Sequence, residues 1–281
     1  MRIFLTGQDG FLGSEIRRQA REAGHEMMCL EKPFRMANPP WDKITAFAPE
    51  VCIHCAWIAT PGLYLESPEN IQHREWSLAM IRRLAELGMR RFVVTGTCAE
   101  YGPSLHPLFE EDEPHPTTLY GREKNLLRVQ LEEEALRSGF DLIWTRVFYP
   151  YGPGEHADRL ISFLIRNALS GKESPLKQPG AFRDYVHVQD IARALLLLAE
   201  KADPGIFNIG TGKGVLLSEI RSLVDVAFGK ARVNYKREES LGIMDSVIAD
   251  ISRISELGWH PQFDMKEGLT TYLHPPQKSQ P

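Results

Sequence analysis

Residues 2–16 of the chain read RIFLTGQDGFLGSEI. The first residues form the apolar run of a buried strand, the last ones have helical spacing, and Gly7, Gly10 and Gly13 lie in between. Glycine in a regular element costs backbone entropy, so three glycines at one junction indicate a backbone that turns sharply and is approached closely. The stretch therefore predicts a strand, a tight turn and a helix over residues 11–23.

The turn has the pattern of a dinucleotide-binding site. Gly7 permits a sharp turn, Gly10 clears space for a diphosphate beside backbone N–H groups, and Gly13 lets the helix pack closely on the sheet. The first helical turn, with Phe11 and Leu12, offers partial positive charge to the phosphates. An ordinary strand–helix turn is the alternative, but the strand before the glycines and the helix after them favour a cofactor, NAD or NADP.

Short apolar runs alternate with helical patterns along the rest of the chain. Strands are expected at 25–31, 51–57, 90–97 and 141–148, and helices at 70–87, 117–138, 160–169, 190–200 and 217–228. The strand-like runs are continuously apolar, which is typical of strands that helices cover on both faces. The pattern predicts an α/β fold with a doubly wound parallel sheet.

Composition changes in the second half, where loops rich in Gly and Pro alternate with short strands and helices. We expect residues 1–148, together with about 184–202, to form a dinucleotide-binding domain. Residues 149–183 and 203–273 are expected to form a smaller, partly interwoven C-terminal lobe. The last residues, 274–281, read HPPQKSQP and are expected to be a disordered tail.

The composition is that of an ordinary globular protein, with 281 residues, 43% of them hydrophobic, and a formal net charge of -4. The acidic balance argues against nucleic acid as the main partner. No apolar stretch is long enough to span a bilayer, and the chain enters its first strand without a leader, so we expect a cytoplasmic protein. The four cysteines, Cys29, Cys52, Cys55 and Cys98, are interpreted as reduced thiols. Cys52 and Cys55 would point to opposite faces of a strand, so no metal site is predicted.

Tyr120 and Lys124 lie four residues apart, on one face of a predicted helix. A phenol is a weak acid with an ordinary pKa of about 10, and a nearby ammonium lowers that pKa. The pair can therefore give a proton to a carbonyl oxygen while hydride reaches the carbon, or take the proton back. Thr95 and Thr97 end the preceding strand, and either hydroxyl could orient the substrate oxygen. Thr95 is expected instead to satisfy local backbone groups.

The end of the second strand gives conflicting signals about the cofactor. Glu31 could accept hydrogen bonds from the hydroxyls of the adenine ribose, which favours NAD. Lys32 and Arg35 could instead bind a 2′-phosphate, which favours NADP, or could form a solvated loop. The sequence leaves the choice between NAD and NADP open.

Together these motifs resemble an extended short-chain dehydrogenase/reductase of the nucleotide-sugar epimerase/dehydratase family. The resemblance covers nearly the whole chain and rests on TGQDGFLG (6–13), VCIHCAW (51–57), VVTGTCAEYG (93–102), LYGREK (119–124), TRVFYPYGPGE (145–155), FRDYVHVQDIARAL (182–195), FNIGTGKGV (207–215) and DISRISELGWHP (250–261). It implies a Rossmann-type fold, an NDP-sugar substrate bound by the smaller lobe, and a homodimer formed by the helices at 70–87 and 118–138.

The resemblance also assigns roles to individual residues. The catalytic Ser/Thr of the family matches Thr97, and its Tyr and Lys match Tyr120 and Lys124, of which Lys124 also binds the nicotinamide ribose. The residues that the resemblance places along the cofactor cleft are Ala56, Trp57 and Phe148. Arg183 matches an arginine that contacts the substrate diphosphate in relatives, and a surface ion pair with Asp184 is the alternative.

Departures from the family pattern narrow the expected reaction. Dehydratases of the family carry Thr-Asp-Glu at the catalytic strand, whereas this chain has Cys98 and Ala99 after the threonine, and Glu100 is expected to face the other way. Cys98 and Tyr149 are expected beside the substrate, Cys98 as a packing residue and Tyr149 where many relatives have asparagine. These features, and the short connection over residues 31–51, resemble bacterial 4-ketoreductases of deoxysugar pathways, such as CDP-abequose synthase-like enzymes.

The resemblance therefore predicts NAD(P)H-dependent reduction of an NDP-4-keto-6-deoxyhexose at C4, with Tyr120 as general acid. An NAD-dependent NDP-sugar 4-epimerase, similar to UDP-galactose 4-epimerase, would use the same residues and is the alternative. A non-catalytic dinucleotide-binding protein is a further alternative, and the complete set of Thr97, Tyr120 and Lys124 argues against it.

Overall fold

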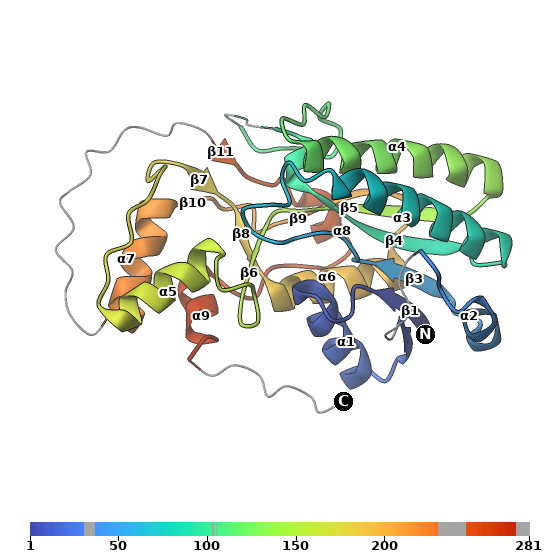
Figure 1. Ribbon diagram of the computed structural model, residues 1–281, viewed down its shortest axis with the longest axis horizontal. Coiled ribbons are helices and arrows are strands. Elements are labelled where there is room, and N and C mark those ends of the chain that lie inside the picture. Colours follow the sequence, from blue (N-terminus) through green and yellow to red (C-terminus); the bar gives the residue numbers. More distant parts are fainter. Residues whose placement is uncertain (31–36, 103, 105, 230–245, 274–281) are drawn as a thin grey trace.

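A six-stranded parallel sheet forms the centre of the molecule (Figure 1). The computed structural model describes residues 1–30, 37–102, 104, 106–229 and 246–273. The strands of the sheet run in the order β2 (Glu26–Cys29), β1 (Arg2–Thr6), β3 (Val51–His54), β4 (Arg91–Thr97), β5 (Asp141–Val147) and β9 (Gly205–Ile209). Each neighbouring pair in this order is parallel, which confirms the predicted doubly wound α/β fold.

Helices cover both faces of the sheet (Figure 1). On one face, α1 (Phe11–Glu22) packs against α6 (Val188–Lys201), and on the other, α3 (Glu69–Glu86) packs against α4 (Leu119–Ser138). The short α2 (Trp41–Phe47) lies between β2 and β3 in the chain. In β1, Ile3 and Leu5 face the α1–α6 core, whereas Phe4 faces the α3–α4 core. This two-sided burial explains the continuous hydrophobicity of the strands. The homodimer expected across α3 and α4 stays a prediction.

The helix that carries two of the predicted catalytic residues has the predicted ends. It begins after Thr118, whose Oγ1 accepts a hydrogen bond from the N–H of Gly121 at 3.1 Å. It ends before Gly139, which has a φ of 66°, a conformation that glycine adopts without steric cost. The cap at Thr118 fixes the first turn of α4, in which Tyr120 lies.

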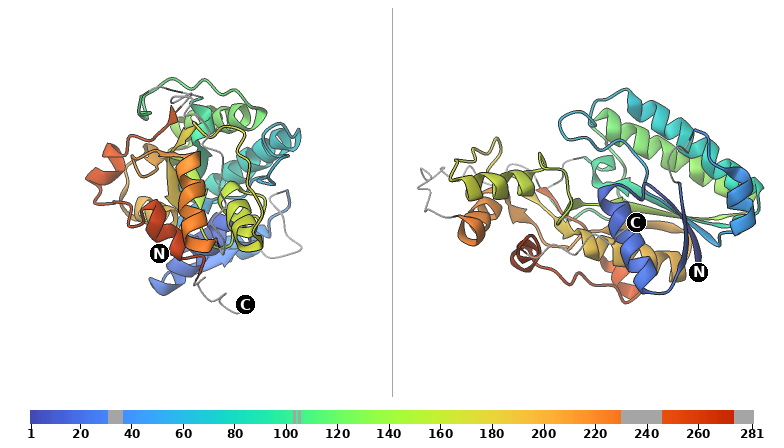
Figure 2. Two further views of the ribbon diagram at one scale, coloured as in Figure 1. Left: turned by 90° about the vertical axis from the view of Figure 1, so that its left-hand side faces the viewer. Right: turned by 60° about the horizontal axis from the view of Figure 1, so that its bottom comes forward.

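A smaller lobe lies at one end of the sheet (Figures 1 and 2). Its elements are β6 (Tyr149–Tyr151), α5 (Leu160–Ser170), β7 (Phe182–Arg183), β8 (Tyr185–His187), β10 (Val215–Leu216), α7 (Leu217–Phe228), β11 (Ser246–Val247) and α9 (Met265–Thr270). Helices α5, α7 and α9 enclose an apolar core of their own. Because α6 and β9 return to the main sheet between these elements, the lobe is interwoven with the first domain.

One boundary of the predicted lobe is wrong. The prediction places residues 203–273 in the lobe, but β9 pairs with β5 in the main sheet, and α8 (Ser252–Glu256) packs against β9. Phe207 and Ile209 of this strand are buried in the α1–α6 core, so the strand gains its burial from the first domain. The predicted tail, 274–281, lies outside the described residues. Within the described part of the chain, no helix combines the length and the apolar character needed to cross a membrane.

Candidate active site

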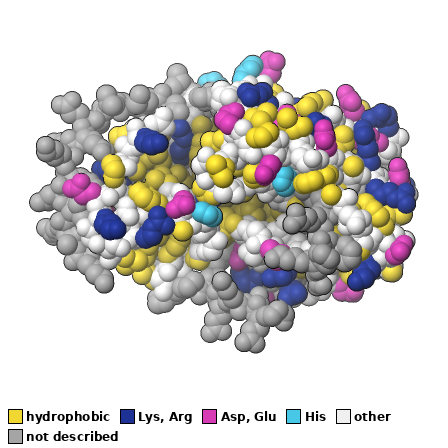
Figure 3. All heavy atoms as spheres, viewed as in Figure 1, with side chains coloured by type: hydrophobic (Ala, Val, Ile, Leu, Met, Phe, Trp, Pro, Cys, Tyr) yellow, Lys and Arg dark blue, Asp and Glu magenta, His cyan; other side chains and the backbone are white. Residues whose placement is uncertain are grey.

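A cavity of about 690 Å³ opens at the carboxyl ends of β1, β3, β4 and β5, the edge at which doubly wound sheets bind ligands. Figure 3 shows a hollow in this region of the surface, with hydrophobic side chains on its floor. The predicted site residues that line the cavity are Gly7, Gly10, Phe11, Leu12, Gly13, Ala56, Trp57, Thr97, Cys98, Tyr120, Lys124, Phe148, Tyr149 and Arg183. The other predicted cofactor contacts, Glu31, Lys32 and Arg35, lie outside the described residues, so the choice between NAD and NADP stays open.

The glycine turn has the tight geometry that the sequence predicts. Gly7 has a φ of 77°, and its carbonyl accepts a hydrogen bond from the N–H of Gly10 at 2.9 Å. A Cβ on Gly13 would lie 2.0 Å from the same carbonyl oxygen, so a side chain cannot be accommodated without a shift of the backbone. Gly10 precedes α1 and provides no side chain to cap its first N–H groups. These donors lie at the cavity wall, and they fit the diphosphate of a dinucleotide.

Thr97 and Tyr120 reach the cavity from two different elements. Thr97 ends β4, and Tyr120 lies in the first turn of α4, where its N–H donates to the Leu65 carbonyl at 2.9 Å. The ring of Tyr64 packs edge-on against the ring of Tyr120, with the centroids 5.0 Å apart. Burial raises the pKa of Tyr120, while a hydrogen bond with the Thr97 side chain acts in the opposite direction. The phenol is therefore protonated at neutral pH.

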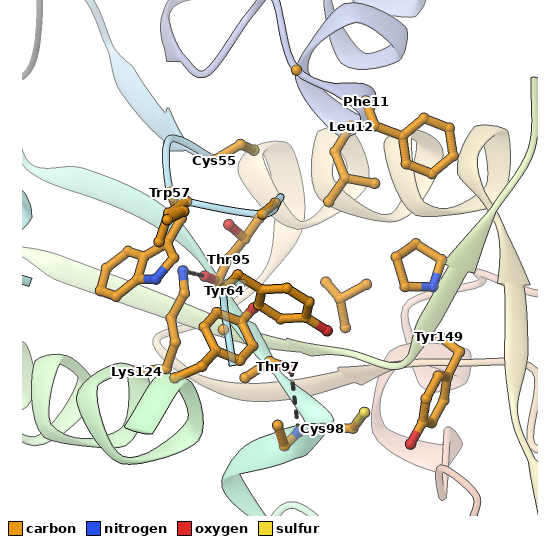
Figure 4. A pocket seen from close by; sticks show the side chains of 18 of the residues that line it. Phe11, Leu12, Cys55, Trp57, Tyr64, Thr95, Thr97, Cys98, Lys124 and Tyr149 are labelled. Atoms are coloured by element: carbon orange, nitrogen blue, oxygen red, sulfur yellow. Dashed lines mark hydrogen bonds between the residues drawn. The ribbon is translucent and has the colours of Figure 1, made fainter. Parts of the chain in front are cut away.

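Lys124 is buried against β4, with its ammonium held between a carbonyl and a ring (Figure 4). Its Nζ donates a 2.6 Å hydrogen bond to the Thr95 carbonyl and lies 3.9 Å from the centroid of the Trp57 ring. Burial lowers the pKa of Lys124 to about 7. The pKa of Tyr120 was expected to be lowered; the net direction is wrong, because burial raises the pKa of this phenol and outweighs the effects that lower it. Thr95 Oγ1 donates to the His54 carbonyl at 3.0 Å, as expected of a residue that satisfies local backbone groups.

An arginine and a tyrosine line the cavity at the smaller lobe. The guanidinium of Arg183 lies 5.6 Å from the centroid of the Tyr149 ring. Asp184, the next residue, is fully buried, and its carboxylate accepts hydrogen bonds from Thr211, Gly212 and Ala249. The alternative of a surface ion pair between Arg183 and Asp184 is wrong, because both residues are buried. Burial raises the pKa of Cys98 to about 12, so its thiol is protonated at neutral pH.

Arg159 and Tyr64 are among the residues of the cavity wall that were not identified from the sequence. Arg159 directly precedes α5 and ends a loop rich in Gly and Pro. Tyr64 lies in the loop between β3 and α3, and its side chain points into the cavity beside Lys124 and Thr97 (Figure 4). A cation before a helix and an aromatic residue in a loop are both common in surface segments, so neither pattern by itself indicates a ligand.

Several proteins of known activity are similar to this chain. The UDP-glucose 4-epimerase of Rhizobium meliloti (strain 1021) is 25% identical over an alignment 309 residues long, which covers 94% of this chain and 93% of that protein. The dTDP-4-dehydro-6-deoxyglucose reductase of Escherichia coli is 25% identical over 225 residues, which cover 75% of this chain and 71% of that protein. The crystal structure of the UDP-glucose 4-epimerase of Thermotoga maritima, solved with UDP-glucose, has a TM-score of 0.81 at 25% identity, covering 97% of this chain and 98% of that one.

Residues 3–210 match the NAD dependent epimerase/dehydratase family. The matched range contains the glycine turn, the strands that bound the cavity, and Thr97, Tyr120 and Lys124. The family is NAD dependent, which confirms the expectation that the cofactor is NAD or NADP. The chain therefore belongs to the NAD dependent epimerase/dehydratase family, whose members act on nucleotide sugars as oxidoreductases or epimerases.

Proposed function

We propose that the protein reduces the keto group at C4 of an NDP-4-keto-6-deoxyhexose, with NADH or NADPH as the reductant. The observation that carries the proposal is the phenol of Tyr120, which lines the cavity together with Thr97 and whose pKa is raised by burial, so that it is protonated at neutral pH. A ketone needs a proton donor at its oxygen during reduction. An epimerase begins with oxidation of a hydroxyl, for which the same phenol would first have to lose its proton.

Each residue of the site has a part in this reduction. The dinucleotide, when bound, supplies the hydride to C4. Tyr120 gives its proton to the C4 oxygen, and the Thr97 hydroxyl orients that oxygen. Lys124 binds the ribose hydroxyls of the cofactor through its ammonium and holds positive charge near the phenol. Arg183 binds the diphosphate of the sugar nucleotide in a charge-assisted contact.

The residues after Thr97 disfavour a dehydratase. Elimination needs an acid and a base near neighbouring carbons of the sugar. Cys98 is a thiol whose pKa burial raises to about 12, and Ala99 has no group that can carry a proton. Glu100 does not line the cavity, as predicted, and its carboxylate accepts a hydrogen bond from the buried indole of Trp144 at 3.1 Å. The site thus carries the groups for hydride and proton transfer at one carbon.

A 4-epimerase is the second candidate, because similar proteins are named UDP-glucose 4-epimerase and the same three side chains would serve. One assay separates the two functions. The purified protein is given NADH or NADPH together with CDP-, TDP-, UDP- or GDP-linked 4-keto-6-deoxyhexoses, and the nicotinamide absorbance is followed.

The proposal expects one molecule of NADH or NADPH to be consumed for each ketosugar reduced, with one nucleotide strongly preferred. In a parallel arm, UDP-glucose is incubated without added cofactor and the products are separated by chromatography. Interconversion of UDP-glucose and UDP-galactose by protein that retains NAD through purification, with no consumption of NADH or NADPH by any ketosugar, would overturn the reductase in favour of the epimerase.

A further inference from the structure

A buried carboxylate lies directly beneath the end of β4. Glu100 is fully buried, in the short 3₁₀ helix η1 (Cys98–Glu100), and it accepts hydrogen bonds from the Thr97 N–H at 2.8 Å, the Arg146 Nε at 3.0 Å and the Trp144 Nε1 at 3.1 Å. Burial raises the pKa of Glu100, and the charge of Arg146 and the hydrogen bonds act against this rise. All three partners are donors, so the geometry fits an ionised carboxylate rather than a protonated one. Arg146 is 1% exposed, and this ion pair is shielded from solvent.

Gly96 of β4 leaves the space that this carboxylate occupies. A Cβ on Gly96 would lie 2.4 Å from Glu100 Oε1 and 2.3 Å from the indole nitrogen of Trp144, so a side chain at this position would occupy the space of the hydrogen-bonded pair. The Thr97 Oγ1 also accepts a hydrogen bond from the Ala99 N–H at 3.2 Å, which completes a reciprocal cap around the turn. The backbone of Thr97 is therefore held from two sides.

The same turn contacts the first turn of α4. A Cβ on Gly121 would lie 2.5 Å from the Ala99 carbonyl oxygen, which shows how closely the two backbones approach. Tyr120 directly precedes Gly121, so a displacement of the turn would move the phenol relative to Thr97. The buried ion pair thus supports a turn that includes Thr97 and contacts the helix of Tyr120, the two residues that handle the substrate oxygen in the proposed function.

The charge of Glu100 also acts on Lys124: burial lowers the pKa of this lysine, and the negative charge of Glu100 raises it. The titratable groups around Lys124 are His54 from β3, Cys55 from the end of that strand, His73 from α3, Tyr120 from its own helix and Glu100 from η1. Burial lowers the pKa of His54 to about 3 and raises that of Cys55 to about 12, so both are neutral at pH 7. Burial also lowers the pKa of His73 and raises that of Tyr120. Among these groups, Glu100 is the one that supplies negative charge.

We propose that Glu100 is a positioning residue: the carboxylate, anchored by Arg146, holds the backbone of Thr97 and thereby places its hydroxyl. The negative charge of Glu100 also favours the protonated form of Lys124. This inference rests on the proposed function for its effect on turnover, but its effect on Lys124 concerns cofactor binding and holds for any dinucleotide enzyme built on this site. The carboxylate does not touch the substrate or the cofactor, and it acts through Thr97, which orients the substrate oxygen, and through Lys124, which binds the cofactor.

The test compares Glu100→Gln with a matched control, Glu110→Gln. Glu110 is also buried, with 5% of its surface exposed. Its Oε1 accepts a hydrogen bond from the Asn208 N–H, and within the described part of the chain its side chain has no hydrogen bond to Thr97 or to η1. A glutamine at 100 keeps the size but removes the charge, and its NH2 group replaces one of the two oxygens that accept hydrogen bonds from Thr97, Trp144 and Arg146, so the cluster that holds Thr97 has to rearrange. Two quantities are measured across pH: the dissociation constant of NADH or NADPH by fluorescence, and kcat and KM with the preferred ketosugar.

In the wild-type protein, we expect cofactor binding to weaken as the pH rises above about 7, because Lys124 then loses its positive charge. This fall in affinity is the pH limb that the test follows. In Glu100→Gln, we expect this limb to move to lower pH by about one unit, because the stabilising charge is gone. We expect kcat to fall by about 10- to 100-fold, with KM within about twofold, because the Thr97 hydroxyl is misplaced while substrate binding is kept. In Glu110→Gln, both the limb and kcat stay at the wild-type values.

A second variant keeps the test decisive if the first unfolds. Glu100→Gln combined with Arg146→Met removes both charges of the buried pair and avoids an unpaired guanidinium, so it should regain the stability that the single variant loses. The pH limb should still lie below that of the wild-type protein, but by less than in the single variant, because the loss of the guanidinium charge partly offsets the loss of the carboxylate. An unshifted limb in the folded double variant, or an equal shift in Glu110→Gln, would overturn the inference. If no ketosugar is reduced by the wild-type protein, the proposed function fails, and the cofactor titration still decides the role of Glu100.

Discussion

The two halves of the cavity differ in the groups that form them, which are backbone atoms in one half and side chains in the other. The cofactor half is made of backbone from one continuous stretch, where Gly7, Gly10 and Gly13 bring carbonyl and N–H groups within close distance. The catalytic half is made of side chains, with Thr97 from the end of β4 and Lys124 from α4 supported by buried polar groups. Substitutions that add a side chain should therefore disrupt the cofactor half, whereas substitutions that remove a proton donor or a charge should disrupt the catalytic half.

The difference also separates stability from function. In the cofactor half, close packing serves both purposes, since the contacts that shape the turn also hold the helix on the sheet. In the catalytic half, Lys124 is buried at a cost, which its lowered pKa records. A substitution in the first half should therefore reduce stability and binding together, whereas one in the second can reduce turnover while the fold stays intact or becomes more stable.

The largest effect is expected for Tyr120→Phe in the catalytic half. The variant keeps the ring that packs against Tyr64 but lacks the proton that the C4 oxygen receives. We expect kcat for ketosugar reduction to fall by about 10³-fold, with the dissociation constant of the cofactor within about twofold. Cofactor consumption and fluorescence titration measure the two quantities. The matched control is Tyr64→Phe, which should lose far less, and equal losses in the two variants would contradict the assignment of Tyr120 as the acid.

In the cofactor half, Gly13→Ala is expected to act through the backbone. Its Cβ would lie 2.0 Å from the Gly7 carbonyl oxygen, so α1 must move away from the turn. We expect a loss of about 2–4 kcal/mol in the free energy of unfolding, and a rise of at least about tenfold in the dissociation constant of the cofactor. Denaturant unfolding and fluorescence titration measure both. Ser14→Ala, at an exposed position of the same helix, should change stability by less than about 0.5 kcal/mol. A stable Gly13→Ala variant that binds the cofactor normally would refute the close approach.

The contrast between the halves also explains what the sequence could predict. The glycine turn is local, so its spacing alone predicts its structure and its ligand, and the cap at Thr118 and the stop at Gly139 predict the ends of α4 in the same way. The partners of Glu100 are not local, since Arg146 reaches it from the next strand of the sheet. The sequence predicts that Glu100 faces away from the substrate but gives no means to identify the pair it forms.

Two further misses have the same cause. The strand β9 has the composition of any short buried strand, and its place beside β5 depends on a contact across the sheet. The pKa of Tyr120 was expected to fall because Lys124 lies one helical turn away, but spacing along a helix does not report burial, which governs this phenol. Pattern reasoning thus captures the order of elements and the identity of the reactive groups, and it misses quantities set by the surrounding core.

Lys124→Met sharpens the contrast, because it should lower activity, by less than Tyr120→Phe does, and raise stability. In the folded protein, burial lowers the pKa of Lys124 from 10.5 to about 7, so the unfolded chain binds this proton more tightly. The destabilisation is absent above pH 10.5, grows as the pH falls from 10.5 to about 7, and is constant below that. At pH 7 we expect the methionine variant to be more stable by about 1–2 kcal/mol, after the loss of the hydrogen bond to the Thr95 carbonyl.

Unfolding curves of the wild-type protein and of Lys124→Met at a series of pH values measure this effect. The difference in stability should shrink as the pH rises towards 10, and cofactor binding by the variant should lose the pH limb near neutrality. Lys124→Arg serves as the control, because its charge persists throughout the range, and it should show no such limb. A methionine variant that is less stable than the wild-type protein at every pH would show that the lysine is not buried at a cost.

The smallest effect is expected where the two halves meet the lobe, for Arg183→Lys. The substitution keeps a positive charge at the cavity wall but loses the planar fork of donors that matches a diphosphate. We expect KM for the sugar nucleotide to rise by about five- to tenfold while kcat stays within about twofold, because binding is weakened equally in the ground state and the transition state. Arg166→Lys, at an exposed arginine of α5 that does not line the cavity, should leave both values unchanged. If Arg183→Lys instead lowers kcat at constant KM, the guanidinium contributes to the catalytic half, and the division between binding through Arg183 and proton transfer through Tyr120 has to be redrawn.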